Sequence, residues 1–426
     1  MSGQKIYLAL SPKCIKSLLV FFLFGINISN ALSQKTNPKK NAVTKVYFPS
    51  LHKWEKRTPL EAGFDTAKLN AAIRFAMEKE NRNPRSMQLS HNLNFGNEPF
   101  NEGIGPFKDR GNPTGLVIHK GYIIAEWGEP LRVDMTHSVT KSFLSIVVGL
   151  AVDRGLINNI NDPVARYTPL IELYELQSAN GNITVPVKDK IFYPFATVHN
   201  SKLNWDVMLR QTSDWEGELW GKPDWADRPD PDTTKWRNRK RNEPGTVFEY
   251  NDVRVNVLAL AATSVWRKSL PQVLKENIMD PIGASNTWRW NGYYNSWIVL
   301  DGLPVQSVSG GGHWGGGMFI NAYDMGRFGL LTMHKGKWNG RQLISTKWIQ
   351  QSITPTAAQP GYGYMNFYLN TDKKFLPVAP PAAFAHVGNG RNVIYVDAEN
   401  ELVIVVRWIE NNAVNDFVRK VLEALK

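Results

Sequence analysis

Apolar residues follow a strand-like pattern near both ends of the chain and a helical pattern in the middle. Residues 115–127 form two apolar runs around Lys120-Gly121, which predicts a hairpin. Residues 384–396 and 402–409 predict two further strands around a turn at residues 397–400. This order predicts an α+β fold, with an antiparallel sheet built from both chain ends, flanking helices and an inserted, mainly helical domain.

Helical periodicity accounts for most of the remaining chain. Asp65 caps the first helix, and a polar, Asn- and Gly-rich connector follows it at residues 81–113. The expected helices span residues 66–80, 136–155, 203–211, 253–266, 270–279, 322–334 and 413–425. We expect the sheet domain to comprise residues 48–155 and 300–426, and the inserted helical domain residues 156–299.

The helix expected from Thr136 onward is apolar on nearly every side, but its first turn is polar. Apolar residues fill most positions from Phe143 to Val152, and a helix of this kind belongs in a protein interior. Ser138 and Lys141 lie three residues apart, so their side chains share one side of the helix. Because polar groups are costly to bury, we interpret Ser138 as a nucleophile and Lys141 as its first base.

The pattern Ser-x-x-Lys alone is weak evidence for such a site. It also occurs at Ser50 and Lys53, where no apolar helix follows. About one or two copies are expected by chance in a chain of this length. The apolar helix behind Ser138 is therefore what distinguishes it.

The composition is that of a folded enzyme, and the beginning of the chain resembles an export signal. Hydrophobic residues make up 42% of the 426 residues. Residues 1–33 combine a basic start, an apolar run and a small-residue exit, and residues 34–47 are expected to form a flexible tether. The single cysteine, Cys14, precedes the apolar run, so signal cleavage would exclude disulfides and thiolate sites. We expect a periplasmic or secreted protein without stable membrane insertion.

Charge and histidine placement limit the classes of partner. The net charge is +12, part of it in a basic stretch at residues 235–241, for which a solvated loop and recognition of an anion are both open. No nucleic-acid-binding motif accompanies this stretch, and we expect no nucleic-acid partner. The eight histidines are scattered without a metal-binding pair, so we expect neither a metal nor a cofactor. The glycine run at residues 310–317 lacks the strand–helix setting of a nucleotide loop and is interpreted as a loop with unusual backbone angles near the site.

Two further motifs could complete the chemistry. Tyr250 ends an extended run that follows Pro244-Gly245, just before a helix. A tyrosine needs nearby cations to act as a base, and Lys141 could supply one. His386-Val387-Gly388-Asn389 lies in the first C-terminal strand region, where an amide could stabilise an oxyanion.

Together and in this order, the three motifs resemble the serine β-lactamase and penicillin-binding protein superfamily. The nearest resemblance is to its class C-like branch of esterases, D-amino-acid peptidases and 6-aminohexanoate-dimer hydrolases. It covers roughly residues 48–426, includes residues 209–213, and implies a β-lactamase/transpeptidase-like fold. It also implies that Ser138 is acylated, that Lys141 accepts its proton, and that Tyr250 relays protons to the leaving group and helps to activate water.

The same resemblance assigns the C-terminal motif to the substrate side of the site. The backbone amides of Ser138 and Asn389 would form the oxyanion hole. Gly388 would lie in the strand beside the substrate, and His386 would stand where many relatives carry lysine.

Asp252 departs from the family pattern, because relatives usually carry asparagine there. An ionised carboxylate accepts hydrogen bonds but donates none. In relatives the asparagine is associated with the amide carbonyl of the substrate, so Asp252 argues against acylamino β-lactams and toward another acyl group or a cationic moiety. Neutralisation of Asp252 by Arg254 is an equally open, structural interpretation.

The leading hypothesis is an exported serine hydrolase that cleaves an ester, amide or lactam bond in a small or short peptide-like substrate. We prefer an esterase or amide hydrolase to a true β-lactamase because of Asp252. The alternative is a non-catalytic protein that binds cell-wall or polysaccharide fragments, motivated by the basic stretch and by neighbouring tryptophans. Of these, we expect Trp220, Trp225 and Trp236 at a substrate rim, and Trp205 and Trp215 in the core.

Overall fold

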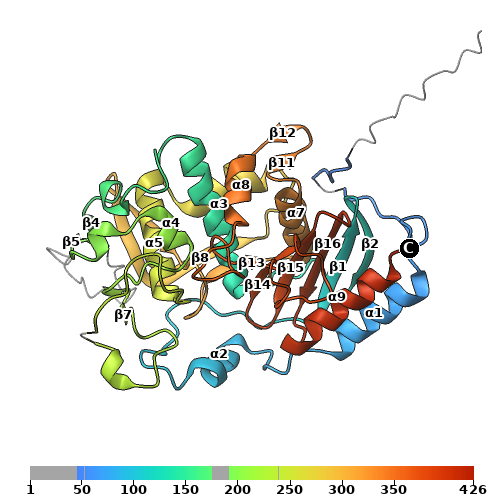
Figure 1. Cartoon of the computed structure of the whole chain (residues 1–426), viewed down its shortest axis with the longest axis horizontal. Helices are drawn as coiled ribbons and strands as arrows, with labels where there is room; N and C mark the ends of the chain where they lie inside the picture. The colour runs from blue at the N-terminus through green and yellow to red at the C-terminus, as the bar shows by residue number, and fades with distance from the viewer. Residues whose placement is uncertain (1–45, 52, 175–190, 238) are drawn as a thin grey trace, which may run out of the picture. The chain divides into compact units, whose positions relative to one another are not determined.

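The computed structural model describes residues 46–426 apart from His52, residues 175–190 and Asn238. The expected export signal and nearly all of the expected tether lie outside the described residues. Figure 1 shows a large sheet beside a helix-rich region. Within the described part of the chain, no helix is long and apolar enough to cross a membrane.

The large sheet is antiparallel throughout and joins the two ends of the chain. Its strand order is β13-β14-β15-β16-β1-β2, and β16 pairs with β1. This arrangement confirms the predicted α+β class with a sheet built from both ends. The strands are β1 (Thr114–His119), β2 (Tyr122–Trp127), β13 (Phe367–Leu369), β14 (Phe384–Gly388), β15 (Asn392–Asp397) and β16 (Leu402–Arg407).

The prediction of one strand over residues 384–396 is wrong, because this segment is a hairpin. β14 and β15 pair antiparallel, with Gly388 opposite Asn392. The turn passes through Gly390 at φ +70° and Arg391 at φ +51°, where Asn389-Gly390 supplies typical turn residues.

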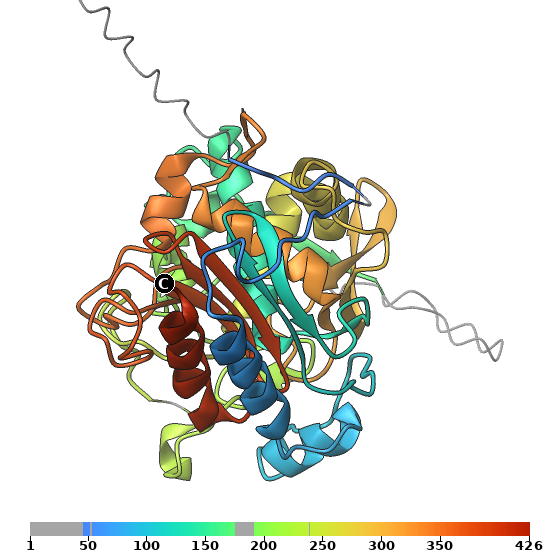
Figure 2. The same cartoon turned by 90° about the vertical axis from the view of Figure 1, so that its right-hand side faces the viewer.

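Helices cover both faces of this sheet. On one face α1 (Thr66–Glu78) and α9 (Val414–Ala424) lie side by side, as Figure 2 shows. Leu69 and Phe417 from these helices pack in the same apolar cluster as Val117 and Ile404 of the sheet. On the other face α7 (Ala322–Met333) packs against β1, β15 and β16. Because strand side chains alternate between faces, both faces need apolar positions.

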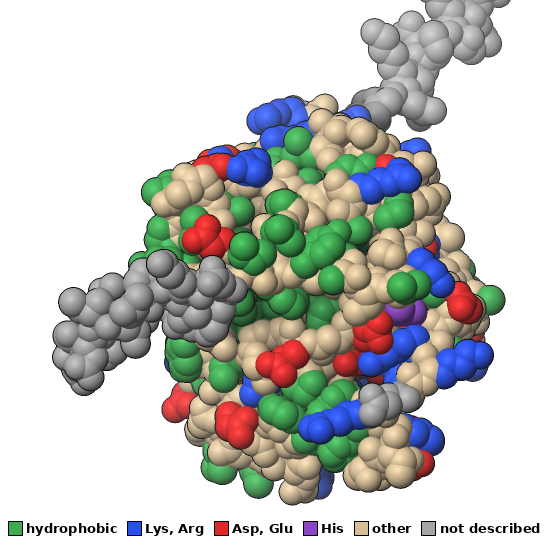
Figure 3. Space-filling view, turned by 90° about the vertical axis from the view of Figure 1, so that its left-hand side faces the viewer, with side chains coloured by type: hydrophobic (Ala, Val, Ile, Leu, Met, Phe, Trp, Pro, Cys, Tyr) green, Lys and Arg blue, Asp and Glu red, His purple; other side chains and the backbone are tan. Residues whose placement is uncertain are grey.

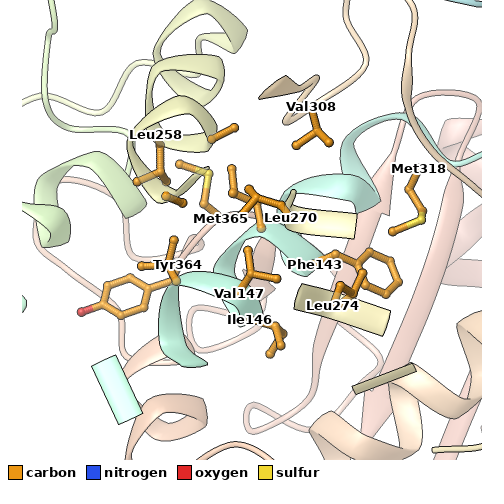
Figure 4. Close-up of a cluster of buried hydrophobic side chains, with 14 of the residues drawn as sticks. Phe143, Ile146, Val147, Leu258, Leu270, Leu274, Val308, Met318, Tyr364 and Met365 are labelled. Carbon is orange, nitrogen blue, oxygen red and sulfur yellow. The ribbon is translucent and has the colours of Figure 1, made fainter. Parts of the chain in front are cut away.

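A second cluster of buried apolar side chains surrounds the helix α3 (Thr140–Asp153), as expected from its apolar sequence. Every residue from Thr140 to Ala151 is buried. In Figure 4, Phe143, Ile146 and Val147 lie among side chains from surrounding elements, including Leu258 and Leu270. These neighbours belong to α5 (Asp252–Trp266) and α6 (Leu270–Leu274).

The segment at residues 156–299, which we expected to be mainly helical, also contains strands. A second sheet has the order β3-β10-β8-β4-β5, with β9 paired to β8. Its strands are β3 (Asp134–Met135), β4 (Ile171–Leu173), β5 (Ile191–Phe192), β8 (Arg289–Leu300), β9 (Leu303–Val308) and β10 (Gly317–Ile320). The limits of a separate inserted domain stay a prediction.

The short elements lie in the connections. They are α2 (Met87–Phe95), α4 (Trp205–Leu209), α8 (Thr346–Ser352), β6 (Glu218–Leu219), β7 (Lys222–Pro223), β11 (Lys337–Trp338) and β12 (Arg341–Gln342). The helix α2 falls within the expected connector at residues 81–113. Its N-cap Ser86 accepts a hydrogen bond from the backbone of Leu89, a capping signal that the sequence carries.

Candidate active site

Ser138 lies in a short 3₁₀ turn, η1 (His137–Val139), that leads directly into α3. His137 has φ +49°, a left-handed conformation that is uncommon for residues other than glycine. Lys141 Nζ donates a hydrogen bond to Ser138 Oγ over 2.9 Å. The nucleophile candidate and its base candidate are therefore in direct contact, although the α-helix itself begins two residues after Ser138.

Lys141 is fully buried and forms an ion pair with Asp252, the first residue of α5. Burial lowers the pKa of the Lys141 ammonium group, and the Asp252 carboxylate opposes that shift. Burial would raise the pKa of Asp252, but Lys141 and Arg228 lower it below its usual value. The Asp252 carboxylate therefore opposes the effect of burial on Lys141, next to Ser138.

The suggested neutralisation of Asp252 by Arg254 is wrong. Arg254 Nη2 lies 2.7 Å from Asp214 Oδ1 and Nη1 lies 2.9 Å from Glu249 Oε2. Asp252 instead uses Lys141. Its carboxylate is therefore occupied within the protein, which also removes the reason to expect a cationic substrate group at this position.

Tyr250 joins the site through an asparagine that sequence reasoning missed. The Lys141 Nζ atom lies 4.6 Å from the centre of the Tyr250 ring. This agrees with the expectation that Lys141 lies near Tyr250. The Tyr250 hydroxyl donates to Asn366 Oδ1 over 3.0 Å, and Asn366 Nδ2 donates to the Ser138 carbonyl over 2.8 Å. Burial raises the pKa of Tyr250 well above its usual value, so its resting form is a neutral hydroxyl that can donate a proton.

The strand β14 passes Ser138 so closely that Gly388 is the residue that fits. A Cβ atom on Gly388 would lie 1.9 Å from the Thr136 carbonyl oxygen and 3.2 Å from the Ser138 backbone nitrogen. Gly388 and Asn389 line the same cleft as Ser138. The expected oxyanion-hole residues are thus brought together, and the role of their amides stays a prediction.

His386 is not part of this cleft, so its expected place beside the substrate is wrong. Its side chain is buried beneath α3, with Nδ1 2.9 Å from Ser142 Oγ and Nε2 3.3 Å from Thr332 Oγ1. The rings of Phe367 and Phe384 pack against it. The physical reason is strand alternation: His386 shares its face of β14 with Phe384, and that face is covered.

The cleft in front of Ser138 has a volume of about 650 Å³, a size suited to a small-molecule substrate. It carries both aromatic and cationic side chains. Its walls include Ser138, Tyr250, Phe248, Tyr362, Tyr368, Phe375, Arg228, Lys374, Arg391, Gly388 and Asn389.

Comparison with known proteins agrees with this geometry. The family model described as Beta-lactamase matches residues 132–419. The chain belongs to the β-lactamase family. Its matched segment contains Ser138, Tyr250 and the β14 residue Gly388, which line the cleft described above, and the buried Lys141.

Solved structures show the same fold at low sequence identity. EstCE1, described as a hydrolase with promiscuous acyltransferase activity, is 13% identical with a TM-score of 0.51, over 84% of this chain and 98% of that one. A family VIII carboxylesterase is 19% identical with a TM-score of 0.50, over 84% and 96%. A penicillin-binding protein homolog from Caulobacter crescentus is 14% identical with a TM-score of 0.51, over 84% and 98%. A comparison with curated proteins gives no match.

The glycine run of this β-lactamase-family protein lies against the Lys141–Asp252 pair. A Cβ atom on Gly311 would lie 2.1 Å from Lys141 Nζ and 2.2 Å from Asp252 Oδ1. Gly312, Gly315, Gly316 and Gly317 have φ between +66° and +88°. The prediction of a loop with unusual backbone angles close to the site is confirmed.

Three acidic or imidazole side chains near this loop also escaped sequence reasoning. Glu98, Asp227 and His313 place potential ligand atoms within 4.8 Å of one another. They come from distant parts of the chain, so no spacing pattern could indicate them.

Arg239 and Arg241 of the basic stretch form ion pairs, and no described residue of the stretch lines the Ser138 cleft. Arg239 pairs with Asp214, and Arg241 Nε lies 3.1 Å from Glu216 Oε2. Figure 3 shows Lys and Arg side chains next to Asp and Glu side chains on one face of the molecule. Neither an isolated solvated loop nor an open anion site describes Arg239 and Arg241.

The tryptophans divide differently from the expectation. Trp205 and Trp215 are buried, as predicted. Trp220 is also buried, and Trp225 stacks on Trp236 with ring centres 5.1 Å apart. None of these five residues is among those that line the cleft around Ser138, so the predicted substrate rim is wrong.

Proposed function

We propose that this protein is a serine hydrolase that forms an acyl-enzyme on Ser138. The observation that carries the proposal is the 2.9 Å contact between Ser138 Oγ, at the cleft wall, and the buried amine of Lys141. A serine hydroxyl next to a buried lysine is a nucleophile beside a base. Membership of the β-lactamase family supports the same chemistry.

Each side chain has a distinct role in the proposed reaction. Lys141, once deprotonated, accepts the Ser138 hydroxyl proton while Oγ bonds to the substrate carbonyl carbon. Tyr250 then donates its proton to the leaving group as the carbonyl–leaving-group bond breaks, and it recovers a proton from Lys141. A water molecule completes the cycle by attacking the acyl carbon and losing a proton to the same pair. The bond between the acyl carbon and Ser138 Oγ then breaks, Oγ takes back a proton from the pair, and the acid is released.

The oxyanion of the tetrahedral intermediate needs donors on the other side of the carbonyl. The close approach of Gly388 to Ser138 supports the backbone amides of Ser138 and Asn389 in this role. Asn366 supports the arrangement by holding the Tyr250 hydroxyl and the Ser138 carbonyl from one side chain.

An ester or amide is the preferred substrate within this class, and a β-lactam the second choice. Asp252 presents no amide group to a substrate, and its carboxylate is paired with Lys141. A substrate whose recognition depends on a side-chain amide at this position gains nothing from it. We also retain the proposal that the protein is exported to the periplasm or secreted after cleavage of residues 1–33.

Fluorophosphonate labelling tests the nucleophile directly. We expect a single covalent adduct on the peptide that contains Ser138, and loss of the adduct and of ester hydrolysis in Ser138→Ala. The matched control is Ser142→Ala, which removes a buried hydroxyl in the first turn of α3. An adduct elsewhere, or hydrolysis that survives Ser138→Ala, contradicts the assignment and favours the non-catalytic binding hypothesis or another nucleophile.

A substrate panel then separates the chemical classes. Short p-nitrophenyl esters and D-amino-acid amides should be cleaved faster than nitrocefin. Rapid nitrocefin turnover would instead identify a true β-lactamase. Sequencing the N-terminus of protein recovered from the periplasm or medium tests the export proposal independently.

A further inference from the structure

A second cavity lies at the start of α7 and has no part in the reaction proposed above. Its volume is about 330 Å³, a size suited to a small ligand. Its walls come from residues 51–56, residues 283–285, the first turns of α7, and Ile123 and Leu131. None of these described lining residues also lines the cleft around Ser138. The cavity is therefore separate from the candidate active site.

Backbone contacts fix the walls of this cavity. The backbone nitrogen of Ile123 donates to the Glu55 carbonyl over 3.2 Å, and that of Arg57 donates to the Ile123 carbonyl over 3.0 Å. On the opposite wall, a Cβ atom on Gly283 would lie 2.8 Å from the Leu51 backbone nitrogen. The segment at residues 51–57 is thus held between β2 and the loop that contains Gly283.

Arg327 of α7 brings a buried positive charge to this cavity. The residue is 6% exposed. Its Nη2 atom donates to the Ser50 carbonyl over 3.0 Å, whereas its Nε atom has no hydrogen-bond partner among the described residues. Burial lowers the pKa of Arg327, because the surroundings solvate the cation less well than water does. A buried charge of this kind calls for a counter-charge.

The nearby carboxylates are occupied by other groups. Asp324 partly opposes the pKa shift of the guanidinium, but its oxygens accept the Ser285 backbone N–H over 2.9 Å and Asn321 Nδ2 over 2.9 Å. Glu126 pairs with Lys56 over 2.6 Å. Within the described part of the chain, no carboxylate therefore forms an ion pair with the Arg327 side chain.

Aromatic and apolar side chains surround this guanidinium. Arg327 Cζ lies 4.6 Å from the centre of the Trp54 ring, and the Trp54 and Tyr323 rings lie 6.1 Å apart, measured between their centres. Leu51 and Leu131, which also line the cavity, are exposed. An aromatic ring packs well against such surfaces. The N–H groups of a guanidinium form a fork that matches the two oxygens of a carboxylate.

We propose that this cavity is a second ligand site, which binds a small carboxylate with an aromatic or short apolar body. The carboxylate pairs with Arg327, and the body packs against Trp54 and Tyr323. A neutral ligand would leave the guanidinium without a counter-charge. Inorganic phosphate would supply the charge but leave the aromatic and apolar surfaces uncovered. The proposal goes beyond the serine-hydrolase function and does not depend on it.

The test titrates wild type with benzoate, benzamide and inorganic phosphate. Protein labelled with 5-fluorotryptophan reports on the site through the ¹⁹F signal of Trp54, which is assigned by its absence in Trp54→Phe. Benzoate should shift this signal in a saturable manner and bind about 10-fold or more tightly than the neutral benzamide. Phosphate should bind more weakly than benzoate.

Three results in wild type would overturn the proposal. They are equal affinity for benzoate and benzamide, tighter binding of phosphate than of benzoate, and the absence of a saturable Trp54 shift at about 10 mM benzoate. This comparison uses the charge of the ligand as its variable, so it stands even if a variant of the buried arginine folds poorly.

Two arginine variants then locate the carboxylate. Arg327→Gln should weaken benzoate binding, measured at Trp54, about 10-fold or more and leave benzamide binding unchanged. The matched control is Arg391→Gln, which removes a guanidinium from the Ser138 cleft and should leave the Trp54 titration unchanged. The reverse pattern would assign the anion to the cleft and overturn the proposal.

Fluorophosphonate labelling keeps this result apart from the proposed function. Arg327→Gln should be labelled at Ser138 as wild type is, because Arg327 lies outside the cleft. If wild type itself is not labelled, the serine-hydrolase function fails, while the Trp54 titrations still decide whether the second site binds a carboxylate.

Discussion

The carboxylate of Asp252 contacts the ammonium group of Lys141, the same group that donates a hydrogen bond to Ser138. The family resemblance leads one to expect asparagine at this position, whereas Asp252 here contacts Lys141, the proposed base. An adjacent carboxylate stabilises the protonated amine. A proton must leave this pair before Lys141 can accept one from Ser138.

Asp252→Asn should therefore shift the activity profile toward lower pH. The carboxylate opposes the lowering of the Lys141 pKa by burial, and its removal lets that pKa fall further. We expect the rise of kcat/KM with pH to move downward by about one unit or more. The check is a pH–rate profile with a neutral ester, and Asp153→Asn, an exposed change at the end of α3, serves as the control.

Gly311→Ala should damage catalysis through the same pair. The new methyl group would overlap both Lys141 Nζ and Asp252 Oδ1, so the amine must move away from Ser138. A displacement of about 1 Å can cost about 100-fold in rate, and we expect a loss of that size in kcat. Gly340→Ala is the matched control, because that glycine has φ +85° but open space around it. It should lower stability without changing kcat.

Local patterns were sufficient for the elements that define the centre of the site. The apolar run after Lys141 identified a buried helix, and Lys120-Gly121 identified the hairpin, because each signal lies within a few residues. The spacing of Ser138 and Lys141 also places their side chains in contact. The glycine run predicted unusual backbone angles, because this signal too lies within a few residues.

Contacts between distant segments were beyond the reach of these patterns. Asn366 joins Tyr250 to Ser138 from a loop in the C-terminal part of the chain, and it has φ +63°. His313 and Glu98 meet although they lie far apart in sequence. Strand alternation, in contrast, does predict that His386 lies on the same face of β14 as Phe384 and is buried with it. The family resemblance predicted a position beside the substrate instead.

Arg391 should favour substrates with an anionic group. It lines the cleft next to Asn389, and its Nε atom has no hydrogen-bond partner among the described residues. The other cations of the cleft have acidic neighbours, Asp227 for Arg228 and Asp372 for Lys374. A charge-assisted hydrogen bond is worth about 1.5–3 kcal/mol, so Arg391→Gln should raise KM for a p-nitrophenyl hemisuccinate about 10-fold or more.

A neutral ester of the same length provides the comparison for Arg391→Gln, and its KM should stay within about twofold of wild type. Arg237→Gln, an exposed change in the basic stretch outside the cleft, is the control variant. Equal effects on both esters would show that Arg391 shapes the cleft without reading charge.

Acid should destabilise the protein through His386. Burial lowers the pKa of His386 to about 3, whereas an unfolded histidine has a pKa near 6.5. Below about pH 6.5 the imidazole of His386 is protonated in the unfolded chain but stays neutral in the native protein. The free energy of unfolding is therefore highest above that pH and falls as pH decreases toward 3. At pH 5 the loss is about 2 kcal/mol, from about 1.4 kcal/mol per pH unit.

His386→Gln should reduce this loss when unfolding free energies from urea titrations at pH 7.5 and pH 5 are compared. His199→Gln, which replaces a half-buried histidine outside the sheet, should leave it unchanged. An equal pH dependence in wild type and His386→Gln would contradict the assignment of a neutral, buried imidazole beneath α3.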